Sequence, residues 1–332
     1  MKAKCILFQC LLVALLLVSC GTSQRHHIQV GKVEPVHVAR FDSLVYDYVQ
    51  ESDSVERIAM MEEAGSFWKI YNARLMRFKN MPFFYEELVR FMNLPSVNKL
   101  YNDALNEYQD MSEIENSLAQ ISARYQKLFS QDKTFVFQSH ISALQIPIIA
   151  VDSLISISID CYLGADYELY ATRYRQYEMI AHDRSCLLPD VAEVMARNAI
   201  PAQQGGLLEA MVYEGVVMHL MAGLLDDVSM ATLMRYTPEQ EAWCIEHEED
   251  IWCSIIEQEH LFTRDAMTIY KYISPTPFTA TLSQDAPARV GRWVGWRIVE
   301  KYMDKRGFTL NDLAADNTPY TEVLRLSNYN GK

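Results

Sequence analysis

Apolar residues recur at spacings of three and four along most of the chain, which is the pattern of amphipathic helices. Met81-Pro82 and Leu94-Pro95 separate periodic segments, because proline disfavours helix at the residue before it. In the first part of the chain the pattern predicts helices over residues 43–64, 66–80, 83–93, 97–110 and 112–131. In the last part it predicts helices over residues 189–199, 206–225, 238–258, 260–272 and 286–304, with short pieces as far as 326.

The residues between these two helical regions follow a different pattern. Residues 134–138 and 146–150 are rich in β-branched and aromatic side chains, and residues 154–162 alternate strictly between apolar and polar. Strict alternation is typical of a half-buried strand, and residues 151–153 have the composition of a turn. We therefore expect a mainly α protein of the α+β class with a small antiparallel sheet, which residues 36–41 extend.

The N-terminus has the features of an export signal. Two lysines precede residues 5–18, which are apolar except for Gln9. Fourteen helical residues reach about 21 Å, which is short of a hydrocarbon core of about 30 Å, so a removable signal sequence fits better than a membrane span. The segment Leu17-Val18-Ser19-Cys20-Gly21 resembles a lipobox, in which the cysteine becomes the lipidated N-terminus after cleavage just before it.

These features predict a lipoprotein signal peptide at residues 1–19 and lipid attachment, including palmitate, at Cys20. An ordinary signal peptide that contains a cysteine is the alternative. Acyl chains alone suffice to hold a protein on a bilayer. Residues 20–30 form a polar tether without the acidic residues that serve as surface-export tags in some lipoproteins. We therefore expect an extracytoplasmic protein on the outer membrane, facing the periplasm, with residues 31–332 as a single, mostly helical domain.

Charge and cysteine content narrow the function further. Removing Lys2 and Lys4 with the signal peptide leaves 28 basic against 43 acidic residues, a net charge of −15. Such a chain repels phosphate backbones, so we expect no nucleic-acid partner. The four cysteines of the predicted domain form no C-x-x-C pair, so the usual zinc and redox motifs are missing. They could form disulfides or remain buried thiols: Cys161, Cys186, Cys244 and Cys253.

Two predicted helices carry charges that need an explanation. Helix 206–225 is apolar on all sides, which predicts burial, yet it contains Glu209, Glu214 and His219. Buried charges are costly unless they are paired, so these groups belong either to a core ion pair or to an active or vestigial site. Helix 238–258 is strongly acidic, which fits a solvated face, an acidic docking surface or a cation site.

The predicted helix 286–304 contains two glycines, Gly291 and Gly295, four residues apart. Each costs roughly 1 kcal/mol relative to alanine in a helix interior. Close approach of another element would offset that cost. The two tryptophans of this helix, Trp293 and Trp296, serve either packing or a binding site.

The chain resembles the gliding-motility lipoprotein B (GldB) family of Bacteroidetes through six segments in sequence order. These are the lipobox, Arg40-Phe41-Asp42, Asp160-Cys161-Tyr162-Leu163-Gly164, Tyr236-Thr237-Pro238-Glu239-Gln240, Pro275-Thr276-Pro277-Phe278-Thr279 and Ala286-Pro287-Ala288-Arg289-Val290-Gly291-Arg292-Trp293-Val294-Gly295-Trp296-Arg297-Ile298-Val299. The resemblance implies a non-catalytic, lipid-anchored envelope protein, without cofactors, that acts through protein partners in motility-related machinery. Arg289 lies in the most specific of these segments and is a candidate functional position beside Glu209, Glu214 and His219.

A second segment is similar to part of a group of zinc metalloproteases. In that group Leu-Leu-x₅-Glu-Gly supplies the third zinc ligand, which would be Glu214 here. Those enzymes also need H-E-x-x-H, whose two histidines share a helix face. Residues 192–196 keep the acid, Glu193, but have Ala192 and Ala196 at the ligand positions. This similarity implies a degenerate zincin-like scaffold without bound metal. The alternative function is that of a divergent zinc-metallopeptidase-like hydrolase that uses Glu214.

Overall fold

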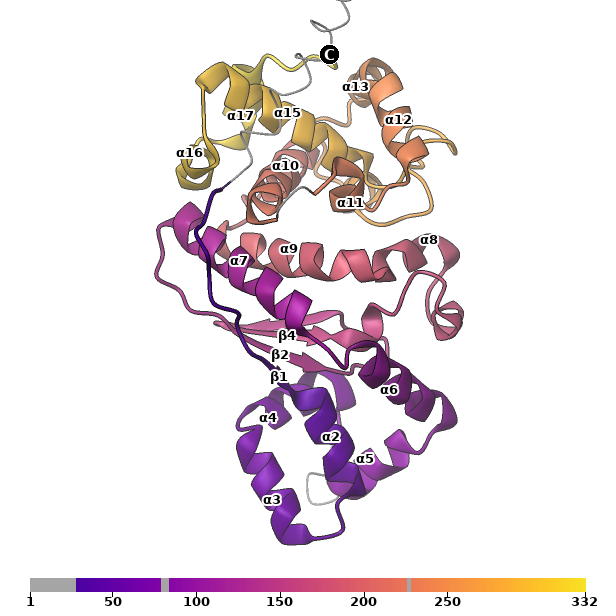
Figure 1. The fold of residues 1–332 in the computed structure, drawn as a ribbon. Helices are drawn as coiled ribbons and strands as arrows, with labels where there is room; N and C mark the ends of the chain where they lie inside the picture. Colours follow the sequence, from indigo (N-terminus) through magenta and orange to yellow (C-terminus); the bar gives the residue numbers. More distant parts are fainter. Residues whose placement is uncertain (1–27, 79–83, 226–227) are drawn as a thin grey trace, which may run out of the picture.

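The computed structural model describes residues 28–78, 84–225 and 228–332, and it places a four-stranded sheet between two groups of helices (Figure 1). The α+β class expected from the sequence is confirmed. The predicted signal peptide, Cys20 and most of the tether lie outside the described residues. The last tether residues are described, and Ile28 is buried in the hydrophobic core. The packed structure therefore begins before residue 31.

Among the described residues of the first helical region there are six α-helices, close to the predicted positions. They are α2 (Phe41–Gln50), α3 (Ser54–Glu63), α4 (Phe67–Tyr71), α5 (Phe84–Met92), α6 (Pro95–Glu107) and α7 (Ser112–Phe129). The single helix expected over residues 43–64 is two helices, because the Asp53 side chain accepts a hydrogen bond from the amide of Val55 and starts α3. A π-helical turn (Asn72–Met76) continues α4.

The sheet has the order β1-β2-β4-β3 and is mixed. Its strands are β1 (Val38–Arg40), β2 (Val136–His140), β3 (Ile148–Val151) and β4 (Leu154–Ser158). The expected antiparallel arrangement holds for β3 and β4 alone, which are joined by a two-residue turn with Asp152 at φ 53°. The pairs β1–β2 and β2–β4 are parallel, so the prediction of a wholly antiparallel sheet is wrong. Parallel neighbours need long crossover connections, and the chain from α2 to α7 provides one.

Both faces of β4 are covered, which corrects the prediction of a half-buried strand. Helices α2 and α4 lie on one face of the sheet, and α7 and α9 lie on the other (Figure 1). Ser156 and Ser158 are fully buried, and each hydroxyl has a partner. Ser156 contacts Nδ1 of His140 at 2.8 Å, and Ser158 donates to Asp160 at 2.5 Å. A polar strand face is stable here because its groups hydrogen-bond to one another.

The second helical region forms the opposite end of the molecule. Its helices are α8 (Gln176–Met179), α9 (Leu187–Ala199), α10 (Leu207–Leu224), α11 (Met230–Met234), α12 (Pro238–Glu246), α13 (Glu248–Glu257), α14 (Ala266–Ile273), α15 (Val290–Arg306), α16 (Leu310–Ala315) and α17 (Tyr320–Ser327). The acidic helix expected over residues 238–258 breaks at His247, whose Nδ1 donates to the carbonyl of Trp243 at 2.9 Å. Two of its charges are paired, because Glu248 bonds Arg297 and Glu249 bonds Lys332.

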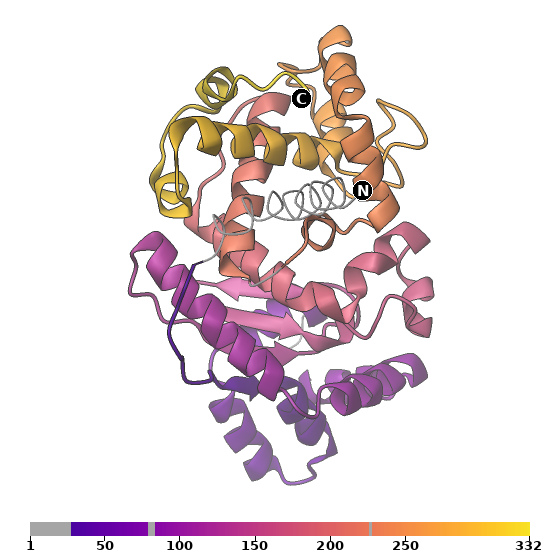
Figure 2. The ribbon, with the colours of Figure 1, turned by 45° about the horizontal axis from the view of Figure 1, so that its top comes forward.

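Helix α10 is the buried centre of this region, as its sequence predicted (Figure 2). It packs against α9, α15 and α17. Its length and hydropathy would allow it to cross a membrane, but 78% of it is buried inside the protein, which is the environment of a core helix. The four cysteines of the described residues are free thiols, and only Cys253 is exposed.

Candidate functional site

Helix α9 presents a carboxylate and a guanidinium on one face. Glu193 and Arg197 are four residues apart, so their side chains are neighbours on the helix surface, and Arg197 Nη2 lies 2.7 Å from Glu193 Oε1. The opposite face of α9 carries Val191, Ala192 and Met195, all fully buried. Packing of that apolar face directs the charged pair toward α10.

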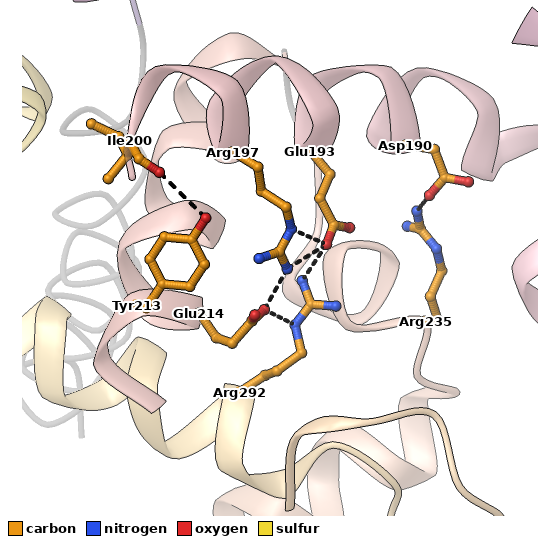
Figure 3. A network of polar contacts seen from close by, with 8 residues as sticks. All are labelled: Asp190, Glu193, Arg197, Ile200, Tyr213, Glu214, Arg235 and Arg292. Carbon is orange, nitrogen blue, oxygen red and sulfur yellow. Dashed lines mark hydrogen bonds and ion pairs between the residues drawn. The ribbon is translucent and has the colours of Figure 1, made fainter. Parts of the chain in front are cut away.

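Glu214 from α10 and Arg292 from α15 complete a group of four charges, which we call the ionic cluster (Figure 3). Glu214 Oε2 lies 2.7 Å from Arg197 Nη2 and 3.0 Å from Arg292 Nε. Arg292 Nη2 also lies 3.4 Å from Glu193 Oε1. The side chains of Glu214 and Arg292 are 9% and 6% exposed. Two carboxylates and two guanidinium groups therefore balance in a partly buried space between three helices.

The pKa shifts follow from this arrangement. Burial raises the pKa of Glu193, but the charges of Arg292 and Arg197 and the hydrogen bond from Arg197 outweigh burial and lower it to about 2. Burial lowers the pKa of Arg197, and the hydrogen bond from Glu214 together with the charge of Glu193 raises it well above its usual value. In both residues the charges and hydrogen bonds outweigh burial, so the net shifts favour the ionised forms of Glu193 and Arg197 at neutral pH.

The ionic cluster contains Glu214, the residue that the metalloprotease similarity would make a zinc ligand, and Glu193, the acid of the incomplete H-E-x-x-H segment. The helix with Glu193 does lie beside the helix with Glu214, as that similarity implies. Ala192 and Ala196 supply no ligand atom, and Arg197 bridges the two carboxylates. Zinc binds neutral histidine, thiolate or carboxylate groups, and a guanidinium between the carboxylates repels a cation. No group of three or more His, Cys, Asp or Glu side chains in the described parts of the chain could hold a metal ion. The side chains present do not fit zinc.

Glu209 and His219 lie apart from the ionic cluster and have structural contacts. Glu209 accepts a hydrogen bond from the amide of Gly206 at 2.8 Å, which closes the first turn of α10. His219 is fully buried and stacks on Trp296 with ring centroids 3.8 Å apart. Glu214 forms ion pairs within the cluster, whereas Glu209 has its contact with a backbone amide and His219 has its contact with an aromatic ring.

Arg289 lies where three of the family-like segments meet. The amide and hydroxyl of Thr279 donate to the carbonyls of Ala286 and Pro287 at 3.1 and 2.5 Å. The hydroxyl of Tyr236 donates to the next carbonyl, that of Ala288, at 2.5 Å. These bonds fix the backbone directly before Arg289, which has the left-handed conformation with φ 60° and precedes the first residue of α15.

Beside Arg289 lies a cleft of about 440 Å³, which we call the motif cleft. Its walls come from residues 174–182, 234–237, 275–277 and 288–289, with single residues from other elements. Arg235 and Asp190 line the cleft and form an ion pair, which lies beside the ionic cluster (Figure 3). Asp190 also accepts a hydrogen bond from Tyr162 at 2.7 Å.

Sequence reasoning missed the arginines of the ionic cluster and the Asp190–Arg235 pair. Arg197 was detectable, because Glu193 and Arg197 have the i,i+4 spacing of a helical ion pair. Arg292 lay inside the most specific family-like segment but carried no local signal of its partner. Arg235 and Asp190 are 45 residues apart, and nothing in the local pattern joins them.

The comparison with known proteins agrees with the resemblance that the segments suggested. Residues 23–331 match the sequence profile of the family described as gliding motility protein GldB. No curated protein sequence and no solved structure matched the chain. Because the match covers nearly the whole length, from the tether to the last helix, the chain belongs to the gliding motility protein GldB family.

Proposed function

We propose that this protein is a non-catalytic lipoprotein of the cell envelope that acts through a protein partner in a gliding-motility-associated system. In this proposal a lipid on Cys20 anchors the chain to the outer membrane, with the folded residues in the periplasm. Family membership supports the association with gliding motility. The lipobox supports the anchor.

The ionic cluster is the observation that supports a non-catalytic role. A hydrolytic zinc site needs three protein ligands and an open coordination position. Here Arg197 binds both Glu193 and Glu214, and Arg292 contacts the same two carboxylates. Removing a charge from such a network leaves its partner uncompensated, so the four side chains stabilise the packing of α9, α10 and α15. A structural use of the carboxylates accounts for their burial.

The surface of the second helical region supports a protein partner. Monomeric proteins rarely expose large apolar side chains in groups unless they bind something. Residues 245–270 include Phe262 and Met267, which are 67% and 63% exposed, and three further exposed large apolar side chains: Ile245, Ile256 and Tyr270. Helices α12 and α13, which contain Ile245 and Ile256, are also acidic. A partner with an apolar and basic surface fits this chemistry.

Metal content and peptidase activity test the non-catalytic role. The purified protein is expected to contain no stoichiometric zinc and to leave casein intact, with and without added zinc. One zinc per chain, with casein cleavage that stops on chelation and in Glu214→Gln, would establish the hydrolase instead. Photo-crosslinking in intact cells tests the partner. A crosslinker at Phe262 should give a discrete protein adduct that is absent when the crosslinker replaces the exposed Val136 on the sheet, and equal labelling from both positions would contradict the proposal.

A further inference from the structure

The motif cleft has the size and wall chemistry of a small-ligand site. Its volume of about 440 Å³ lies within the roughly 300–1,000 Å³ range of ligand pockets. Prolines and tyrosines form much of the wall, including Pro275, Pro277, Tyr174 and Tyr177. Such pockets bind through apolar surface and take their specificity from a few polar groups. The polar groups of this cleft therefore decide what it binds.

Two arginines line the cleft, and only one of them is paired. Arg235 bonds Asp190. Glu178, another charged wall residue, accepts a hydrogen bond from the amide of Arg175 at 2.7 Å and starts α8. Within the described parts of the chain, Arg289 has no ion pair and no side-chain hydrogen bond. Burial, with the nearby charge of Arg292, lowers the pKa of Arg289 to about 10. Arg289 still carries its charge at neutral pH, and in the described parts of the chain neither Arg289 nor Glu178 has an ion-pair partner.

The backbone of Arg289 is held in a conformation that arginine does not favour. The left-handed region costs a non-glycine residue roughly 1–2 kcal/mol. Strained residues persist where the surroundings fix them, and they concentrate at functional sites. Here Thr279 and Tyr236 fix the three carbonyls before Arg289. Glycine would suit this position without strain, so the guanidinium of Arg289 stands here at a cost to the backbone.

His182 adds a hydrogen-bond acceptor to the same wall. Its Nδ1 donates to the carbonyl of Cys161 at 2.9 Å, and its ring stacks on Tyr174. Burial lowers the pKa of His182, although the hydrogen bond to Cys161 opposes the shift. The ring is therefore neutral at pH 7, and Nε2 keeps its lone pair. A ligand that matches both groups has an anionic end and a hydrogen-bond donor such as an amide N–H.

We propose that the motif cleft binds the C-terminal residue of a peptide chain, with its α-carboxylate on Arg289. A single unpaired guanidinium matches a singly charged carboxylate in bidentate geometry, whereas a phosphate dianion would require a second cation. The amide N–H next to the carboxylate fits the acceptor on His182, and the side chain fits the proline and tyrosine walls. A short free peptide and the C-terminus of a partner protein present the same group, so this proposal stands independently of the proposed function.

Calorimetric titration of the full chain, purified in detergent, tests the proposal. The probes are acetyl-Ala-Ala-Phe and acetyl-Ala-Ala-Leu as free acids, the corresponding C-terminal amides, and inorganic phosphate. Charge-assisted hydrogen bonds predict that at least one free acid binds about tenfold or more tightly than its amide. The same tripeptide fused to the C-terminus of a small carrier protein distinguishes the two sources. If the fusion and the free tripeptide bind with equal affinity, the cleft accepts the C-terminus of a protein. If only the free tripeptide binds, the cleft accepts only a short peptide.

Two variants with the same change of charge separate binding from folding. Arg289→Gln is expected to weaken acid binding at least about tenfold, with a melting temperature that does not fall, because it removes an unpaired, partly buried charge. Arg264→Gln, at an exposed position on the same side of the sheet, is expected to bind as the wild type does. The proposal is overturned if no free acid binds, if acid and amide bind equally, if phosphate binds more tightly than the acids, or if Arg289→Gln binds unchanged.

Discussion

Gly215 of α10 lies directly against Gly295 of α15 where the two helices cross. A Cβ atom on Gly215 would come within 2.2 Å of the carbonyl oxygen of Gly295, and one on Gly295 would come within 1.7 Å of the carbonyl oxygen of Met211. Backbone atoms cannot move aside as a flexible side chain can. The helices can therefore approach this closely only because both positions lack a side chain, which confirms the contact expected at Gly295 and identifies Gly215 as its partner.

Gly295→Ala and Gly215→Ala should each destabilise the protein by about 3 kcal/mol or more, at the upper end of overpacking costs. Gly291→Ala should cost less, because its added Cβ would meet the end of the Ile273 side chain at 2.9 Å and would come no closer than 3.0 Å to a backbone atom, the carbonyl oxygen of Tyr272. Gly31, with no atom within 4 Å, is the control. Chemical denaturation measures all four variants. If the unfolding free energies of Gly295→Ala and Gly31→Ala differ by less than about 1 kcal/mol, the close contact at Gly295 is contradicted.

Glu214→Gln should destabilise the protein by roughly 2–4 kcal/mol. The change leaves the buried Arg292 with only its longer contact to Glu193, and loss of one partner of a buried pair typically costs about 3–5 kcal/mol. Glu322→Gln is the control, since Glu322 pairs with Arg325 on the surface and such pairs contribute about 0–1 kcal/mol. Urea unfolding compares the two variants, and equal losses would show that the ionic cluster does not stabilise the fold.

Because the pKa of Glu193 is low in the folded protein, the free energy of unfolding should depend on pH below about 4.5, the usual pKa of a glutamate side chain. The folded pKa of about 2 lies below the unfolded value. Glu193 therefore contributes stability that is fully present above about pH 4.5 and is lost as the pH falls toward 2. The contribution is at most about 3 kcal/mol, since one pKa unit corresponds to about 1.4 kcal/mol. Unfolding free energies of wild type and Glu193→Gln should converge between pH 5 and 2.5, and parallel curves would refute this origin of the pH dependence.

Arg289 and Arg235 both have a left-handed backbone, with φ 60°. Arg235 forms an ion pair, and Arg289 forms none with the described residues. Arg289→Gly should stabilise the protein by about 1–2 kcal/mol, because glycine relieves the backbone strain and no ion pair is lost. Arg235→Gly relieves the same strain but leaves Asp190 without its partner, so it should destabilise. Thermal melts of the two variants should shift in opposite directions. A loss of stability in both would show that Arg289 has a structural role.

Cys20→Ala tests the lipid anchor, which rests on the sequence alone. The lipobox needs a thiol at this position for acylation. The variant should remain uncleaved or appear as soluble protein, with no acyl group detected by metabolic labelling. Replacement of Cys253, an exposed thiol of the folded region, should leave labelling unchanged. Acylation and membrane association of Cys20→Ala at the wild-type level would contradict the anchor.

The sequence alone determined most of the secondary structure and the burial of α10. Periodicity reports which face of a segment is apolar, and a helix without a polar face has to be covered by protein on all sides. The same local reasoning found the β3–β4 hairpin, the close approach at Gly295 and Glu214 as a charge that needs a partner. It failed at element boundaries such as Asp53 and His247, where a single side-chain hydrogen bond divides a continuous pattern.

Only the tertiary structure decided which elements meet. An alternating pattern identifies a strand but not its neighbours, so the parallel pairing of β1 with β2, about 100 residues apart, left no local trace. The partners of Glu214 likewise come from two other helices, and their distances depend on how α9 and α15 cross α10. Neither Arg235 nor Arg289 has a local signal of a partner in the sequence, yet among the described residues Arg235 is paired and Arg289 is not. Electrostatic interactions act through space, so the packing of the helices determines which charges are paired.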